Sequence, residues 1–382
     1  MNRILVPLAA LLIASSHAFA QDRAELTMPP NGDNQKAEVS QWIGLVRVTV
    51  SYHSPRVHFQ GRERTGHIWG ELIPFGLYDE GFGPSRAAPW RAGANESTLI
   101  SFSHDVTIDG KIVKAGSYAL FLELAKEGPW TWILSSNPGW GAFQFDAGDV
   151  VQRISATPQD AEFTEFLTYG FENRLPNAAT MYLQWENKRV ALRIDVPNVN
   201  ELYALQMGKD LRGWAGFNYQ NWQAAAQFAA SNKVMLDDAL AWSEKAISEP
   251  FRNAAKGSAD FSTLSTKANV LAAMGRTIDA DTVMDRAMSM ADATAPAVHQ
   301  YGLRALAAGR KDRAMQIFNA NRRHHPTDQF WPYVGLARGY TALGDTAAAI
   351  ANWTTALKHV PADQQSNRAR FEQALHALRG TT

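Results

Sequence analysis

The chain has 382 residues, of which 46% are hydrophobic and none is cysteine, and Lys+Arg and Asp+Glu both number 37. That length is enough for two domains, each with its own hydrophobic core. The lack of cysteine excludes disulfides, thiolate metal sites and cysteine nucleophiles, and the balanced charge argues against nucleic-acid binding.

The first twenty residues have the three parts of a secretory signal peptide. A basic start at Met1-Asn2-Arg3 precedes an apolar run from Ile4 to Ala14, and Ala18-Phe19-Ala20 is a small-x-small cleavage site. The run is too short to span a bilayer as a helix. We therefore expect cleavage after Ala20 and a periplasmic or secreted protein that does not span a membrane. The alternative is a buried N-terminal helix.

Residues 21–40 are polar and are predicted to be a flexible leader, and residues 41–198 have the pattern of a β domain. Val46, Val48 and Val50 alternate with polar residues, as in a half-buried strand. Roughly ten short strands with turn residues between them predict an all-β antiparallel sandwich or barrel-like domain.

Two turns are expected inside this β domain. Asp109-Gly110 lies between short apolar runs and is a strong signal for a β-hairpin. A second tight turn is expected at Asn187, between a strand that ends at Trp185 and one that begins at Val190. Both turns imply antiparallel pairing of the strands they join.

Tryptophan is concentrated in the β domain, because seven of the twelve lie between Trp42 and Trp185. Most of them are expected to pack in the core or across strands. Trp69, Trp90 and Trp140 lie beside predicted loops, so they are the candidates for an aromatic binding surface.

The second half of the chain has a repeat of 34 to 35 residues. Residues 199–217 are predicted to be a linker or helical connector, and residues 218–382 to be helical repeats that end in a capping helix. Three sets of positions recur together: Gly275, Gly309 and Gly344; Ala280, Ala314 and Ala349; Met284, Phe318 and Trp353. The pattern resembles the tetratricopeptide repeat, and it predicts an α-helical solenoid.

The resemblance to tetratricopeptide repeats implies a groove, lined by the inner helices, that holds a peptide of a protein partner. It would place Asn269, Trp331 and Arg338 in that groove. The alternative is that these three side chains are ordinary solvated or packing residues.

Motifs for common chemistries are missing from the sequence. It has no His-Glu-x-x-His, Gly-x-Ser-x-Gly, Ser-x-x-Lys or phosphate-loop pattern, and no cofactor is predicted. His53 and His58 flank Ser54-Pro55 and are candidate ligand-binding residues, but no third metal ligand is visible nearby, so no metal site is predicted.

The segment Trp90-Arg91-Ala92-Gly93-Ala94-Asn95-Glu96 places an arginine, an amide and a carboxylate next to an apolar strand. Buried polar groups of this kind need partners, because an unsatisfied one costs about 1–3 kcal/mol. Trp90, Arg91, Asn95 and Glu96 therefore form either a structural network, with an Arg91–Glu96 ion pair, or the floor of a ligand site.

Five sequence blocks resemble the exported bacterial family called domain of unknown function 2911. They are Ser54-Pro55, Trp69 to Gly76, Trp90 to Glu96, Ala115 to Phe121 and Trp130 to Leu134, in that order. The resemblance covers Trp42 to Pro197 and implies the β fold and export, but no reaction. The segment Leu77 to Ala88 is an insertion relative to the family pattern.

Two functions remain open at this point. We favour a non-enzymatic exported binding or scaffold protein, in which the β domain holds a ligand or envelope component and the repeats bind a protein. The alternative is a periplasmic hydrolase that acts on an envelope glycan or peptide, with Glu96 as the acid/base.

Overall fold

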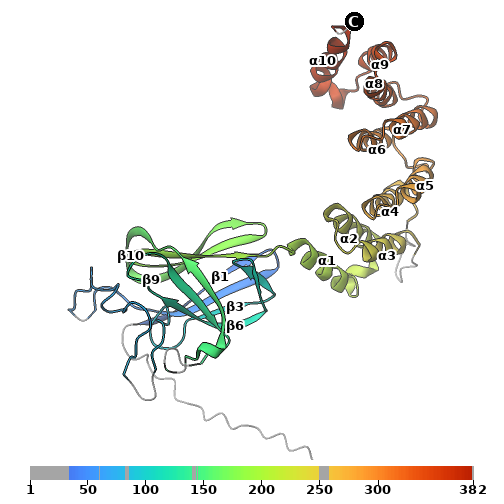
Figure 1. The fold of residues 1–382 in the computed structure, drawn as a ribbon. Coiled ribbons are helices and arrows are strands. Elements are labelled where there is room, and N and C mark those ends of the chain that lie inside the picture. The colour runs from blue at the N-terminus through green and yellow to red at the C-terminus, as the bar shows by residue number, and fades with distance from the viewer. Residues whose placement is uncertain are drawn as a thin grey trace, which may run out of the picture. The chain divides into compact units, whose positions relative to one another are not determined.

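The computed structural model describes residues 34–59, 61–81, 86–139, 143, 145–248 and 258–380. These residues form an N-terminal β domain and a C-terminal helical domain, and the chain divides into two compact units (Figure 1). The expected signal peptide and Trp140 lie outside the described residues. In the part of the chain that the structure describes, no helix has both the length and the apolar character needed to cross a membrane.

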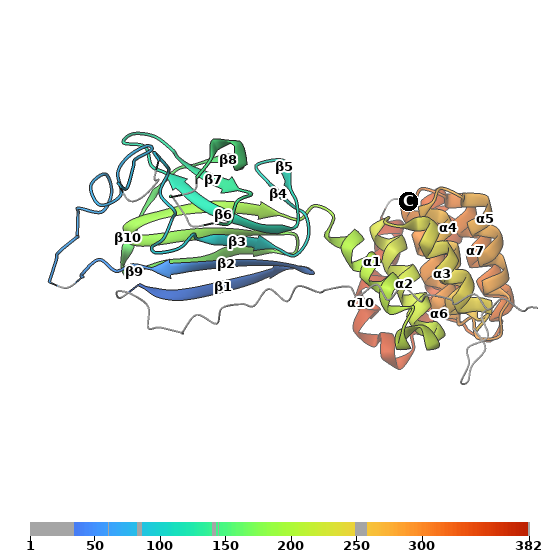
Figure 2. The same cartoon turned by 90° about the horizontal axis from the view of Figure 1, so that it is seen from below.

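The β domain consists of two antiparallel sheets, and neither closes into a barrel within the described residues. The larger has the order β1-β2-β3-β6-β7-β8, with β1, β2 and β3 side by side (Figure 2), and the smaller has the order β5-β4-β10-β9. The strands are β1 Gln35–Ile43, β2 Val46–Ser54, β3 Leu99–Phe102, β4 Val106–Ile108, β5 Lys111–Val113, β6 Gly116–Glu123, β7 Trp130–Ser135, β8 Val150–Ala156, β9 Gln159–Leu175 and β10 Ala178–Asp195. Strand β1 thus begins before the expected domain start at residue 41.

The hairpin predicted at Asp109-Gly110 is confirmed. Ile108 of β4 pairs with Lys111 of β5, so the connection has two residues. Both turn residues have positive φ, 48° and 72°, which is the conformation that Asp-Gly turns favour.

The turn predicted at Asn187 is wrong, because β10 continues through it. Glu186 has a φ of 52°, which bends the strand locally without ending it. The polar residues that follow interrupt the apolar alternation, but they form cross-strand ion pairs with β9: Lys188 with Asp160, and Arg189 with Glu172. Strand β9 itself was not predicted, since its sequence is mostly polar and most of its side chains are at least partly exposed.

Buried side chains connect the two sheets across the core. Trp132 of β7 is fully buried, and its Nε1 donates to the backbone oxygen of Ala191 in β10, at 3.1 Å. Gln152 of β8 similarly donates to the backbone oxygen of Ile108 in β4, at 2.8 Å. These two bonds satisfy polar groups that would otherwise be costly to bury.

The helical domain is built from successive helices that follow an arc (Figure 1). The helices are α1 Val199–Asp210, α2 Tyr219–Asn232, α3 Leu236–Ser248, α4 Phe261–Ala273, α5 Thr277–Met288, α6 Ala295–Ala307, α7 Lys311–His324, α8 Trp331–Leu343, α9 Thr346–Lys358 and α10 Arg368–Arg379. Helix α1 and a short 3-10 turn, Trp214–Phe217, occupy the predicted connector.

The repeated positions of the sequence have the same structural roles in successive helix pairs. Gly275, Gly309 and Gly344 have φ values of 79°, 73° and 83°, and they follow α4, α6 and α8. Glycine adopts this left-handed conformation without a steric cost, so it ends each of these helices and starts a tight turn. The repeated alanines and the large residues four positions after them are all buried.

Candidate functional site

A pocket of about 390 Å³ lies in the β domain beside the Trp-Arg segment. Arg91 lines it and forms an ion pair with Glu80, and each side chain is only 14% exposed. Arg91 also donates to the backbone oxygen of Asn95, which lines the same pocket. The prediction of an Arg91–Glu96 ion pair is wrong, because Arg91 pairs with Glu80 of the inserted segment instead.

Backbone hydrogen bonds join Tyr78 to Ala88, near the two ends of the inserted segment. The amide of Tyr78 donates to the carbonyl of Ala88 at 3.0 Å, and the amide of Ala88 donates back at 2.9 Å. Burial, and then the carboxylate of Glu80, raises the pKa of Tyr78 to about 12. The phenol therefore stays protonated at neutral pH, and its O–H donates to the carboxylate of Glu80.

Glu96 lies in a different, smaller pocket of about 240 Å³. Its Oε2 is 3.1 Å from Nδ1 of His53, which is buried on β2, whereas the Glu96 side chain is half exposed. Burial lowers the pKa of His53, against the opposing effect of Glu96, so the imidazole is neutral at pH 7. The contact is therefore a hydrogen bond of a neutral histidine. Asn95 and Glu96 are adjacent in sequence but line separate pockets.

Trp69 and Trp90 belong to a cluster of tryptophans. The ring of Trp69 lies 5.1 Å from that of Trp130 and 5.9 Å from those of Trp90 and Trp185, measured between centroids. Trp90 is 2% exposed, and its Nε1 donates to the backbone oxygen of Gly93 at 3.0 Å. Trp90 and Trp185 thus form an apolar wall of the 390 Å³ pocket.

His58 is exposed and lies between two carboxylates. Its Nδ1 is 2.7 Å from Glu165 and its Nε2 is 2.9 Å from Glu63, and hydrogen bonding to Glu165 is the largest of the effects that raise its pKa. His53 has other partners, so the structure does not bring the two histidines into one site. Among the described residues, no group of three or more His, Asp or Glu side chains is arranged to hold a metal ion.

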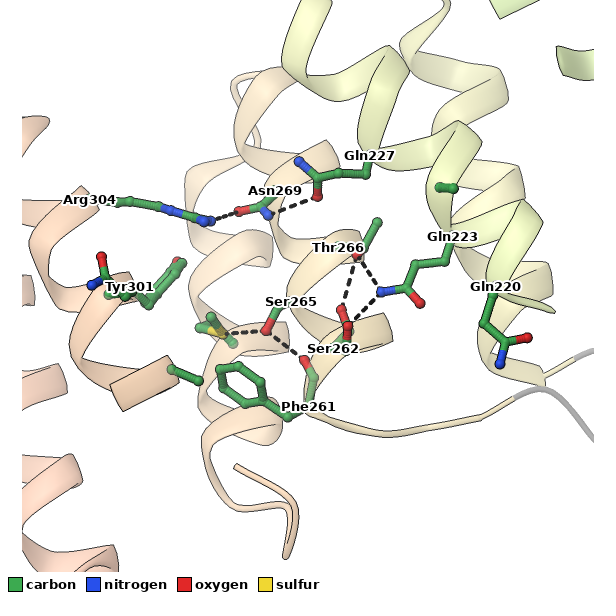
Figure 3. Close-up of a pocket in the computed structure, with 14 residues that line it drawn as sticks. Gln220, Gln223, Gln227, Phe261, Ser262, Ser265, Thr266, Asn269, Tyr301 and Arg304 are labelled. Carbon is green, nitrogen blue, oxygen red and sulfur yellow. Dashed lines mark hydrogen bonds between the residues drawn. The ribbon is translucent and has the colours of Figure 1, made fainter. Parts of the chain in front are cut away.

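A groove of about 610 Å³ crosses α2, α4 and α6 of the helical domain (Figure 3). Asn269 lies within it, donating to Oε1 of Gln227 at 3.2 Å and accepting from Arg304 at 3.5 Å. Gln223 donates to the hydroxyls of Ser262, at 2.7 Å, and of Thr266, at 3.2 Å. We call this the amide groove.

The sequence prediction identified Asn269 but missed the three glutamines of α2. Gln220, Gln223 and Gln227 are three and four residues apart, a spacing that places them on one face of a helix. That spacing was the available signal. It was obscured because none of the recurring repeat positions used for the prediction lies in α2.

Trp331 and Arg338 do not line the amide groove. The ring of Trp331 packs 5.2 Å from that of His299. Arg338 lines a second groove, of about 620 Å³, near the end of the domain, where its guanidinium carbon lies 5.8 Å from the ring centroid of Trp353. The three residues that the repeat pattern grouped together therefore have three different environments.

Comparison with known families gives a match to the first of the two domains. Residues 34–194 match the family model described as "Protein of unknown function (DUF2911)". This DUF2911 region spans all but the last residue of the ten strands and stops before the helices. A search of curated proteins found no match.

The pocket beside Arg91 thus belongs to the DUF2911 region, whereas both grooves belong to the helical domain. Within the DUF2911 region, the polar groups of the Trp90 to Glu96 segment bond to both backbone and side chains. Trp90 and Arg91 donate to the backbone of Gly93 and Asn95, whereas Arg91 also pairs with Glu80 and Glu96 with His53. These bonds hold the pocket wall in one conformation.

His299 makes the stability of the helical domain pH-dependent. Burial, and then the charge of Arg338, lowers its pKa from 6.5 to about 4. The unfolded chain therefore binds the additional proton between these values. We expect this contribution to stability to be complete above pH 6.5 and to be lost as the pH falls toward 4, on the order of 3 kcal/mol in total.

The measurement is urea unfolding followed by helical circular dichroism at pH 7.5 and pH 4.5. Replacing His299→Gln removes the titrating group, and should flatten the pH dependence. His376→Gln on the surface of α10 is the control. An equally steep loss in the His299→Gln variant would contradict this prediction.

Proposed function

We propose that the protein is an exported binding protein whose helical domain is a tetratricopeptide-like array that binds an extended peptide segment in the amide groove. The polar lining of that groove is the observation that carries the proposal. Amide side chains supply both donors and acceptors. An extended backbone, which must satisfy an N–H and a C=O at each residue, requires both.

Two amides of the groove are open for such contacts. The side chains of Gln220 and Gln300 are exposed, and neither forms a hydrogen bond with another described residue. The lining also contains one charged residue, Arg304, and no carboxylate. These features favour a peptide that is neutral or acidic.

The other parts of the proposal concern export and the β domain. The residues 1–20 that resemble a signal peptide support a periplasmic or secreted location. The pocket beside Arg91 supports a ligand of the DUF2911 region, for which Asn95 and the phenol of Tyr78 would supply polar contacts. The protein would then act as a scaffold that binds one component through each domain.

Selection of random peptides by phage display on the full-length protein tests the peptide groove. Enriched peptides should bind wild-type protein in calorimetry, and Gln223→Ala or Asn269→Ala should weaken that binding by about 2- to 10-fold, since one hydrogen bond contributes roughly 0.5–1.5 kcal/mol. Gln206→Ala, an exposed glutamine on α1 outside the groove, is the matched control. Failure to enrich any peptide, or equal affinity in all variants, would refute the proposal.

A further inference from the structure

The second groove of the helical domain has a different chemistry from the amide groove. It measures about 620 Å³ and is lined by α6, α8, α9 and α10. Its apolar lining includes Leu303, Leu306, Ala342, Trp353, Ala374 and Leu378. The volume lies within the ~300–1,000 Å³ typical of small-molecule sites.

Two arginines, Arg338 and Arg370, are the charged residues of this groove. Neither forms an ion pair or a hydrogen bond with any described residue, and Nε of Arg338 is buried without a partner. By contrast, the nearby Arg368 on α10 is paired with Glu372 at 2.8 Å. The groove therefore contains two positive charges without a neighbouring carboxylate.

The charge of Arg370 also affects Arg338. Burial, and then repulsion from Arg370, lowers the pKa of Arg338. Such an arrangement is unfavourable in the empty groove, because Arg338 is partly removed from water and has no counter-charge there. An anion bound between the two arginines would remove that cost and would accept charge-assisted hydrogen bonds.

The rest of the lining indicates what must be attached to the anion. Thr341 is the other polar side chain of the lining, and its hydroxyl already donates to the backbone oxygen of Ala337 at 2.7 Å. A peptide backbone in this groove would leave its N–H and C=O groups unsatisfied. A hydrocarbon chain has no such groups, and it gains by leaving water for the apolar walls.

We propose that this second groove binds a long-chain carboxylate, that is, a fatty acid. Its carboxylate lies between Arg338 and Arg370, and its chain lies along the leucines, the alanines and Trp353. The site is separate from the amide groove, so it adds a small amphiphile to the ligands of the protein.

Titration calorimetry of the full-length protein with laurate, below the concentration at which laurate forms micelles, tests the site. Laurate should bind with a stoichiometry of one. Dodecanol, which has the same chain and no charge, should bind at least about tenfold more weakly, a difference of about 1.4 kcal/mol. Equal binding of the two ligands, or no binding of laurate, would overturn the proposal.

Variants on one helix assign the binding to this groove. Arg370→Gln should weaken laurate binding by about tenfold or more, whereas Arg368→Gln, two residues away, should leave it unchanged. Arg338→Lys keeps the charge over Trp353 and should weaken binding less than Arg338→Gln does. Gln223→Ala in the amide groove should not affect laurate. Undiminished laurate binding to the folded Arg370→Gln variant would overturn the assignment.

Discussion

Glu80→Gln is expected to destabilise the DUF2911 region by about 3 kcal/mol, while Glu96→Gln changes its stability by less than about 1 kcal/mol. Removing one partner of a buried ion pair costs ~3–5 kcal/mol, because the other charge stays buried. The lower end of that range applies here, since Arg91 and Glu80 each retain 14% exposure. Glu96 is half exposed and contacts a neutral histidine, so its charge contributes little.

Urea unfolding followed by tryptophan fluorescence measures this difference, because Trp90 and Trp185 both line the pocket that contains Arg91. Glu71→Gln controls for the loss of one negative charge, because Glu71 is an exposed carboxylate that precedes the insertion. Equal destabilisation by Glu80→Gln and Glu96→Gln would contradict the assignment of Glu80 as the partner of Arg91.

Phe318→Ala is expected to destabilise the helical domain by about 3–5 kcal/mol, the usual cost of removing a buried phenylalanine. Phe318 lies on α7, is fully buried, and fills the space beside two glycines of neighbouring helices. A Cβ placed on Gly302 or Gly335 would lie only 2.2 or 2.5 Å from its ring. The ring therefore packs directly against the backbone of α6 and α8 at these two glycines.

The same contact predicts that substitutions at Phe318 and Gly335 are not additive. Gly335→Ala should destabilise the wild-type protein, because the added methyl group overlaps the ring. In the Phe318→Ala background the same change should cost little, because the space is empty. Urea unfolding followed by helical circular dichroism gives the four stabilities of this cycle. Phe217→Ala, at a half-exposed phenylalanine, is the control, and strictly additive losses would contradict the packing described here.

The structural roles of the repeated residues also explain why the helical part was predictable. Gly309, Ala314 and Phe318 each meet a local requirement: a left-handed turn, a small buried side chain and a large buried side chain. Each requirement recurs in the neighbouring helix pairs, so the sequence repeats it. The prediction for Asn187 failed for the opposite reason. The polar residues there are stabilised by cross-strand partners on β9, and no local pattern records those partners.

Where apolar residues recur at a regular spacing, the amino-acid sequence was enough to predict strands and helices, and it placed the Trp90 to Glu96 segment in the β domain. The pairing of polar side chains, in contrast, could be seen in the folded chain alone. Arg91 bonds to Glu80 rather than Glu96, and Arg338 lines a groove with Arg370. Strands and helices can be predicted because they depend on the spacing of apolar residues along a short stretch of chain. The partner of a charged side chain depends instead on which distant segment the folded chain brings beside it.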